Sequence, residues 1–378
     1  MDALPRTQQL IIKGIDQGLH PGAQVSVWHR GESVTDLAYG EAQPGVAITP
    51  ETLTLWLSSC KPITAVALAK QVEAGVVHLD EPVAEYVNGF EQNGKQGITL
   101  RHVLTHTGGF RSVVFRYPEQ PWEDAIETVC KARLETGWEP GATAGYHPHS
   151  GWNILGRVLE VCTGQPLSQH LRESVLLPLG LDESYVGTPD EAYEELRPRL
   201  SAMIDTGKTV PVDPGFHEKT WVTGQRPGGN AYGPARQLAR FYQALLDITA
   251  GRASGSDALL QPATLADFTA RHRCDTMDRT FRAVMDWGLG FMVNNRRHDA
   301  VNAEKHGPTG TPYGFGPHAS DEAFGHCGNQ SSAAFADPSH DLVAVVIFNG
   351  MPGEPKHQQR MYAVLGAIYE DLGLATTG

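Results

Sequence analysis

A serine and a lysine lie three residues apart in the stretch Leu55–Pro62, where an apolar helix is predicted to begin. Residues three apart share one face of a helix, so the Ser58 hydroxyl can meet the Lys61 amine. A serine hydroxyl becomes a useful nucleophile when a nearby base takes its proton, and a lysine kept neutral by burial can be that base. Ser58 and Lys61 are therefore a candidate nucleophile and base, although Ser58 alone also fits a helix N-cap.

Two later stretches carry further candidate groups. Tyr146 comes shortly before an apolar helix, and a tyrosinate near a lysine ammonium is a workable general base. His326-Cys327-Gly328-Asn329 leads into a predicted strand, where a glycine on an edge strand lets a substrate backbone approach and the next N–H can point at a carbonyl oxygen. Taken singly, a loop tyrosine is more often a packing residue, and a histidine is mostly structural.

Other catalytic arrangements have weaker support. The pairs His102/His106 and His147/His149 have spacings seen in metal sites, but neither pair has the adjacent glutamate of a zinc protease. The sequence has no G-x-S-x-G serine elbow, so an α/β-hydrolase site is not indicated. A serine site centred on Ser58 is the better hypothesis.

Composition excludes several classes of protein. The 378 residues can form one large domain or two interleaved ones, with 40% hydrophobic and 19% charged residues. A net charge of −13 argues against nucleic-acid binding. No signal peptide or membrane-spanning run is apparent, so we expect a cytoplasmic protein without membrane attachment. Five scattered cysteines predict reduced thiols.

Strands are predicted near both ends of the chain. Residues 23–29 and 33–39 alternate around a turn and predict a hairpin, and 288–293, 331–337 and 342–349 are short β-type runs. The middle of the chain is mostly helix and long loops. Helices are predicted at 6–18, 58–75, 80–90, 99–104, 123–134, 152–162, 166–175, 234–248, 262–272 and 358–372. We therefore expect one sheet built from both termini, covered by helices, with a helical insertion.

In this order, Ser58-x-x-Lys61, Tyr146 and His326-x-Gly328 resemble the three motifs of the serine β-lactamase and penicillin-binding-protein superfamily, in its class C β-lactamase and family VIII carboxylesterase branch. The likeness runs from about Gly22 to Leu372. Supporting segments in family order are Ile98–Gly109, Gly228–Asn230 leading to Leu238–Phe241, and Trp287–Phe291.

The resemblance implies an α/β (α+β) fold with an antiparallel sheet and an all-helical lobe. Residues 1–60 and 280–378 would form the α/β domain, 75–279 the mainly helical domain, and the helix 58–74 the boundary. Ser58 would attack an ester or amide carbonyl to form an acyl-enzyme, while Lys61 and Tyr146 shuttle its proton. Backbone N–H groups of Ser58 and Asn329 would form the oxyanion hole, and no cofactor or metal would be needed.

Two departures bear on the substrate. Many relatives have an asparagine two residues after the tyrosine, where this chain has Pro148, and lactamases and peptidases have a lysine where this chain has His326. Both departures point away from cell-wall chemistry. Substrate-binding residues would be His326, Cys327, Gly328, Pro148 and Trp152. Other aromatic residues that could line an acyl pocket, or equally pack the core, are Trp56, Tyr232, Tyr313, Phe315 and Phe324.

The leading hypothesis is a carboxylesterase acting on small or medium esters. An acyltransferase of secondary metabolism uses the same acyl-enzyme, so it stays an alternative. Amide or β-lactam hydrolysis of the D-aminopeptidase type, and a non-catalytic binding protein with this fold, are the others. The expected partner is a small-molecule ester or acyl substrate, and a homo-oligomer is left open.

Overall fold

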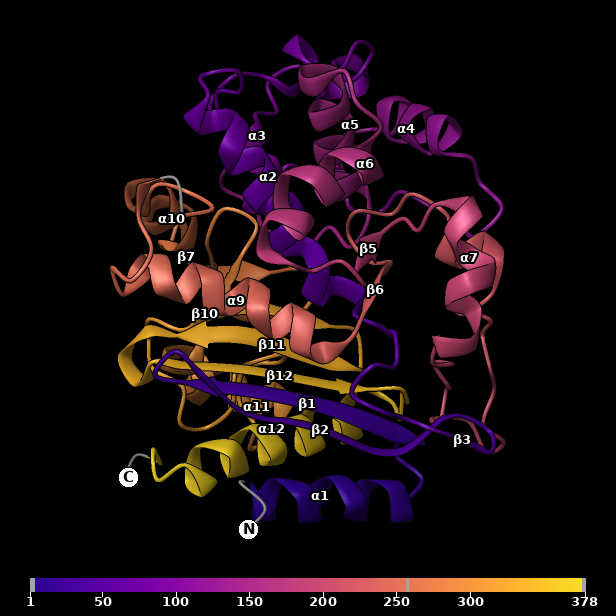
Figure 1. Cartoon of the computed structure of the whole chain (residues 1–378). Helices are drawn as coiled ribbons and strands as arrows, with labels where there is room; N and C mark the ends of the chain where they lie inside the picture. The colour runs from indigo at the N-terminus through magenta and orange to yellow at the C-terminus, as the bar shows by residue number, and fades with distance from the viewer. Residues whose placement is uncertain (1–3, 256–257, 376–378) are drawn as a thin grey trace.

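A nine-stranded antiparallel sheet forms the centre of the molecule. The computed structural model describes residues 4–255 and 258–375. The strand order is β3-β2-β1-β12-β11-β10-β9-β8-β7, so the first and last strands of the chain lie side by side (Figure 1). The strands are β1 Gly22–His29, β2 Glu32–Gln43, β3 Val46–Ala47, β7 Arg273–Asp278, β8 Ala283–Trp287, β9 Met292–Val293, β10 Phe324–Gly328, β11 Ser332–Asp337 and β12 Leu342–Phe348. This confirms the predicted sheet from both chain ends.

The interior strand β12 is apolar on both faces because both faces are covered. Val343, Val345 and Ile347 pack in the cluster that contains α9 (Ala235–Thr249), while Val346 and Phe348 pack with α12 (Glu354–Asp371). Side chains of a strand alternate between its faces, so a wholly apolar strand belongs between two layers. In Figure 1, α9 lies above the sheet, and α12 and α1 (Pro5–Asp16) lie below it.

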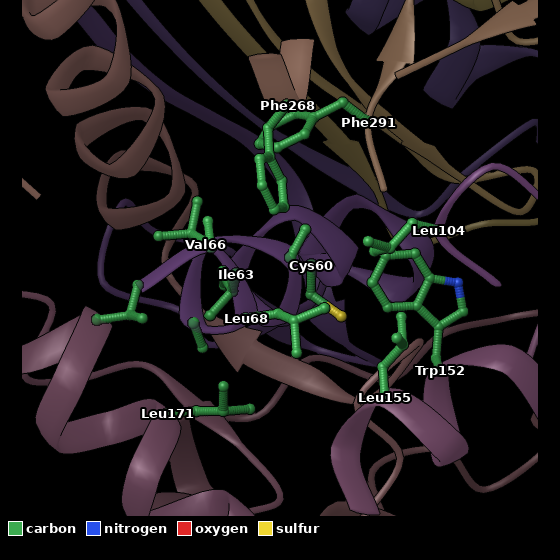
Figure 2. Close-up of a cluster of buried hydrophobic side chains, with 14 of the residues drawn as sticks. Cys60, Ile63, Val66, Leu68, Leu104, Trp152, Leu155, Leu171, Phe268 and Phe291 are labelled. Atoms are coloured by element: carbon green, nitrogen blue, oxygen red, sulfur yellow. The ribbon is translucent and has the colours of Figure 1, made fainter. Parts of the chain in front are cut away.

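Most of the remaining helices gather above α9. They surround α2 (Lys61–Glu73), which is buried along nearly its whole first two turns, and Figure 2 shows its Ile63, Val66 and Leu68 inside a large apolar cluster. The surrounding helices are α3 Leu100–Leu104, α5 Ser150–Thr163, α6 Leu167–Leu171 and α10 Pro262–Thr269, and α4 Trp122–Lys131 packs on α5. The division into two domains stays a prediction. Its predicted bounds include residues 1–3, 256–257 and 376–378, which lie outside the described residues.

Smaller elements complete the chain. A second sheet has the order β4-β6-β5 and joins Thr54–Leu55, Ala231–Gly233 and Tyr185–Val186. Short helices are α7 Asp190–Leu196, α8 Lys219–Val222 and α11 Asp299–His306. No helix among the described residues is long and apolar enough to span a membrane. The cytoplasmic location stays a prediction.

Several predicted elements differ from the structure. The segment 80–90 was expected to be helical but forms only a 3₁₀ turn at Val83–Glu85, because Pro82 bridges to Thr99. The run 288–293 is mostly a turn after β8, and only its last two residues form β9. Residues 273–278 and 283–287 lack clear apolar alternation, which is why β7 and β8 escaped the sequence analysis, as did the polar helix α11.

Candidate active site

Ser58 lies in a 3₁₀ turn, Leu57–Cys60, that directly precedes α2, and not within the long helix that the spacing predicted. The turn is fixed to the sheet by its neighbours. Ser59 Oγ donates to the backbone oxygen of His326 at 3.1 Å and lies 2.9 Å from Ser332 Oγ. Ser332 Oγ also lies 2.8 Å from the oxygen of Trp56. The nucleophile candidate is therefore held against β10 and β11.

Lys61 is the first residue of α2, and its side chain is fully buried. Its Nζ lies 2.9 Å from Ser58 Oγ and 3.0 Å from the backbone oxygen of Pro148, and it also contacts the backbone oxygen of Gly228. Burial disfavours the charged form and lowers the pKa of Lys61 to about 7. A neutral amine is thus readily available near neutral pH.

The contacts of Lys61 determine where its lone pair points. A neutral amine has two N–H donors and one lone pair. The carbonyl oxygens of Pro148 and Gly228 can only accept, so they take the two donors. The lone pair is then left facing Ser58 Oγ, the position required of a base that removes the serine proton.

Tyr146 approaches Ser58 from another segment, and its hydroxyl lies 3.0 Å from Ser58 Oγ. Burial raises the pKa of Tyr146, so the phenol keeps its proton and donates it to Ser58. The backbone around Tyr146 is fixed by Asp278, which accepts from its N–H at 3.1 Å, and by Thr280, which donates to its oxygen at 3.0 Å. Burial favours the neutral forms of both Lys61 and Tyr146. Neutral Lys61 is therefore a better candidate for the base than a Tyr146 tyrosinate.

Asp278 is a structural residue that the sequence analysis missed. It is fully buried, forms an ion pair with Arg273 at 3.1 Å, and accepts backbone N–H groups of Thr280 and Phe281 in addition to that of Tyr146. A buried carboxylate needs such a set of donors. In the sequence, Asp278 is one aspartate in a polar run that does not predict a strand, so nothing marks it as a partner of Tyr146.

His326 is buried beside the catalytic candidates, with its ring 5.9 Å from that of Tyr146. Its Nδ1 lies 2.8 Å from the backbone oxygen of Cys327, which can only accept, so Nδ1 carries the proton. Burial, with Lys61 nearby, holds the pKa of His326 well below its usual range. The ring is therefore neutral, unlike the lysine that occupies this motif position in lactamases.

A cavity of about 730 Å³ opens over Ser58 and Tyr146. Pro148, His326, Cys327 and Asn329 line it, and so does Tyr313. Trp152 instead lies behind Lys61, with Nζ 5.4 Å from its ring centre, in the apolar cluster of Figure 2. Lining residues that the sequence analysis missed include Phe216, Trp221, Arg226, Phe281 and Met351. Trp221 belongs to the short helix α8, and the other four come from loops without a recognisable pattern. Trp56, Tyr232, Phe315 and Phe324 are core residues.

The approach of a substrate at Gly328 stays a prediction, and the structure shows a packing role for the same glycine. A Cβ there would lie 2.3 Å from Ser332 Oγ, 2.8 Å from the oxygen of Trp56 and 3.0 Å from Leu57 Cβ, so the glycine lets β10 pack on the Ser58 turn. Gly328→Ala should lower the free energy of unfolding by about 1–3 kcal/mol, the usual cost of overpacking. It should also displace Ser58. Gly97→Ala, where a Cβ meets no atom within 4 Å, is the control in thermal denaturation. Equal stability of both variants would contradict this role.

The histidine pairs have structural partners. The helix α3 ends at Leu104, so His102 and His106 do not share a helix face, and His102 caps that helix at Thr99. His147 Nε2 accepts from the backbone N–H groups of Gly109 and Phe110, at 3.1 Å each. His106 Nδ1 accepts from the N–H of His147 at 3.1 Å, so three of these four histidines have structural hydrogen bonds.

Comparison with known structures places this fold in a class. The structure resembles a penicillin-binding protein homologue from Caulobacter crescentus, with a TM-score of 0.77 and 24% identity over 98% of both chains. It also resembles a family VIII carboxylesterase, with a TM-score of 0.75 and 23% identity over 98% of both chains. The fold is therefore that of penicillin-binding proteins and β-lactamase-like enzymes.

Sequence comparison gives the family. The model of the Beta-lactamase family matches residues 7–368, nearly the whole chain. The chain is 29% identical to esterase EstB of Burkholderia gladioli (72% of this chain, 74% of the relative) and 28% identical to penicillin-binding protein 4 of Amycolatopsis lactamdurans (72% and 71%). The chain belongs to the β-lactamase family, as a serine hydrolase of the β-lactamase and penicillin-binding-protein type.

Proposed function

We propose that the protein is a carboxylesterase that forms an acyl-enzyme on Ser58 and acts on small or medium esters. The observation that carries the proposal is the position of Ser58 Oγ, 2.9 Å from Lys61 Nζ and 3.0 Å from the Tyr146 hydroxyl, at the wall of a cavity of about 730 Å³. A base and a proton donor on one hydroxyl are what nucleophilic catalysis by serine needs.

In the acylation step, Ser58 Oγ attacks the ester carbonyl carbon while its proton moves to the lone pair of Lys61. The carbonyl oxygen becomes negative and is held by the backbone N–H groups of Ser58 and Asn329, two residues that line the cavity. The bond to the alcohol oxygen then breaks. The proton taken by Lys61 leaves with the alcohol, passed on through the Tyr146 hydroxyl.

In the deacylation step, a water molecule attacks the acyl carbon of the Ser58 ester. Lys61 and Tyr146 again carry the proton, from the water to Ser58 Oγ, as the bond between the acyl carbon and Ser58 Oγ breaks. The carboxylic acid product is thereby released, and the free Ser58 hydroxyl is restored. The same three side chains serve both steps because the second is the first in reverse, with water replacing the alcohol.

The neutral motif residues favour esters over β-lactams and peptides. Where lactamases have a cationic lysine, the neutral His326 offers no charge to a substrate carboxylate. The backbone oxygen of Pro148 accepts a hydrogen bond from Lys61, and its side chain has no amide group that could bind a substrate amide. The likeness to esterase EstB supports the same preference. Acyl transfer, amide or β-lactam hydrolysis and a binding protein stay alternatives.

A fluorophosphonate probe tests the proposal directly. Wild-type protein should gain one adduct, on Ser58, and should hydrolyse p-nitrophenyl butyrate. Its neighbour Ser59 is an internal control, because its hydroxyl is buried and bonded to β10 and β11, so peptide mass spectrometry should find it unlabelled. Protein that neither labels nor hydrolyses a panel of esters would refute the esterase.

A further inference from the structure

The turn between β10 and β11 has an unusual backbone. Asn329 and Gln330 begin it, and Gln330 has a φ of 50°, in the left-handed region that non-glycine residues seldom adopt. Such a conformation persists when surrounding contacts over-determine it, and it is often found near functional sites. Asn329 lines the cavity, so this turn is part of its wall.

Gln330 is held by three contacts from outside the turn. Its N–H donates to the Tyr313 hydroxyl at 3.3 Å, and its backbone oxygen accepts from Arg360 Nη2 at 2.9 Å. Its side-chain Oε1 accepts from the N–H of Gly353 at 2.8 Å. Gly353 is the N-cap residue of α12 and Arg360 lies within that helix, so the helix below the sheet and its start fix the turn beside Ser58.

Tyr313 is itself fixed by the same helix. Its hydroxyl lies 2.6 Å from Glu354 Oε1, and its N–H donates to Gln358 Oε1 at 2.9 Å. Gln358 Nε2 in turn donates to Glu354 Oε2 at 3.3 Å. Glu354 is the first residue of α12, where the helix dipole favours its negative charge.

The phenol has one proton, and its destination follows from these contacts. The Glu354 carboxylate can only accept, so the phenol O–H donates its hydrogen bond to Glu354. The phenol oxygen is then free to accept from Gln330 N–H. Asn329 Oδ1 lies 3.3 Å from the phenol oxygen and is a second acceptor for the same proton, more distant than Glu354 Oε1 at 2.6 Å. Tyr313 thus contacts both residues of the turn.

We infer that Tyr313 and Glu354 are positioning residues for the oxyanion hole: they fix the Asn329–Gln330 turn so that the Asn329 N–H faces the carbonyl oxygen at Ser58. This inference rests on the proposed acyl-enzyme. A donor that is already in place when charge develops stabilises the transition state without reorganisation. A turn with a left-handed residue would move without these contacts.

Glu354 also borders the cavity, and no Lys, Arg or His side chain among the described residues forms an ion pair with it. Its rival role is to bind a cationic substrate. Glu354→Gln and Glu354→Leu separate the two roles, because glutamine keeps an acceptor for the Tyr313 phenol and leucine keeps only the shape. A positioning role is rescued by glutamine, whereas a cation-binding role is lost in both.

The experiment compares ester turnover with inhibition by phenylboronic acid, whose tetrahedral serine adduct places a hydroxyl in the oxyanion hole. Tyr313→Phe and Glu354→Leu should each lower kcat/KM about tenfold, less than the roughly hundredfold loss of a whole donor. The boronic acid inhibition constant should rise by the same factor. Glu354→Gln should stay within about threefold of wild type, because a neutral acceptor keeps the phenol in place.

Lys356→Met, an exposed change on the same helix, is the control and should match wild type. Unchanged kcat/KM in Tyr313→Phe, or a fall without weaker boronic acid inhibition, would overturn the inference. Equal losses in both Glu354 variants, confined to cationic esters, would assign Glu354 to substrate binding instead. Failure of the proposed function is distinct, because wild-type protein would then not label with the fluorophosphonate.

Discussion

Lys61→Met should lower kcat/KM for p-nitrophenyl butyrate by about a thousandfold or more, the upper part of the range for loss of a general base. Methionine fills a similar apolar volume beside Trp152 but has no lone pair of comparable basicity for the Ser58 proton. Lys61→Arg should be equally inactive, because a guanidinium stays protonated and cannot take a proton. A substitution that keeps the positive charge at position 61 is therefore not expected to rescue activity.

The pH dependence of the wild type is the second part of this prediction. The pKa of Lys61 is lowered to about 7, so the amine gains a proton below that pH and loses its lone pair. kcat/KM should fall about tenfold per pH unit below pH 7 and level off above it. Neither Lys61 variant should show this dependence in its residual activity.

Lys70→Met is the matched control, because Lys70 lies on the same helix and donates to the backbone oxygen of Ser174, away from Ser58. It should keep wild-type kcat/KM and the same pH profile. Residual activity above about a tenth in Lys61→Met, or a flat wild-type profile between pH 5 and pH 8, would contradict Lys61 as the base.

The contacts between Ser58 and Lys61 could be predicted because both residues lie within one turn of chain, where local geometry decides which side chains meet. Tyr146 lies 88 residues further on, and its approach to Ser58 was expected only from the order of motifs. The spacing alone gave the correct pair but the wrong local element, since Ser58 is in a 3₁₀ turn and only Lys61 is in α2.

Residues that act by holding others were harder to find. Asp278 and Arg360 are buried charged residues whose partners include backbone groups from distant segments, the N–H of Tyr146 and the oxygens of Gln330 and Gly350. No short-range pattern encodes such contacts, because they depend on how strands and helices pack. Gly328 was recognised as important, but whether its missing Cβ faced a substrate or the Ser58 turn depended on the register of β10 with β11. Local sequence carries no information about that register.

Tyr146→Phe should lower kcat/KM by about a hundredfold or more, because the phenylalanine cannot donate to Ser58 Oγ or pass a proton to the leaving alcohol. The ring packs 4.8 Å from His106 and 5.6 Å from Trp287, and a phenyl ring keeps these contacts. The variant should therefore fold with a near-normal Tm. A fall in activity at constant Tm assigns the loss to the hydroxyl itself.

Tyr193→Phe removes another mostly buried phenol, which bonds to the backbone oxygen of His217 outside the cavity, and it should keep full turnover. Burst kinetics separate the two chemical steps in Tyr146→Phe. If the phenol serves both, the rate of the burst and the later steady rate fall together, since both the leaving alcohol and the departing serine oxygen need a proton. Near-normal turnover in Tyr146→Phe would leave Lys61 as the sole proton carrier at Ser58.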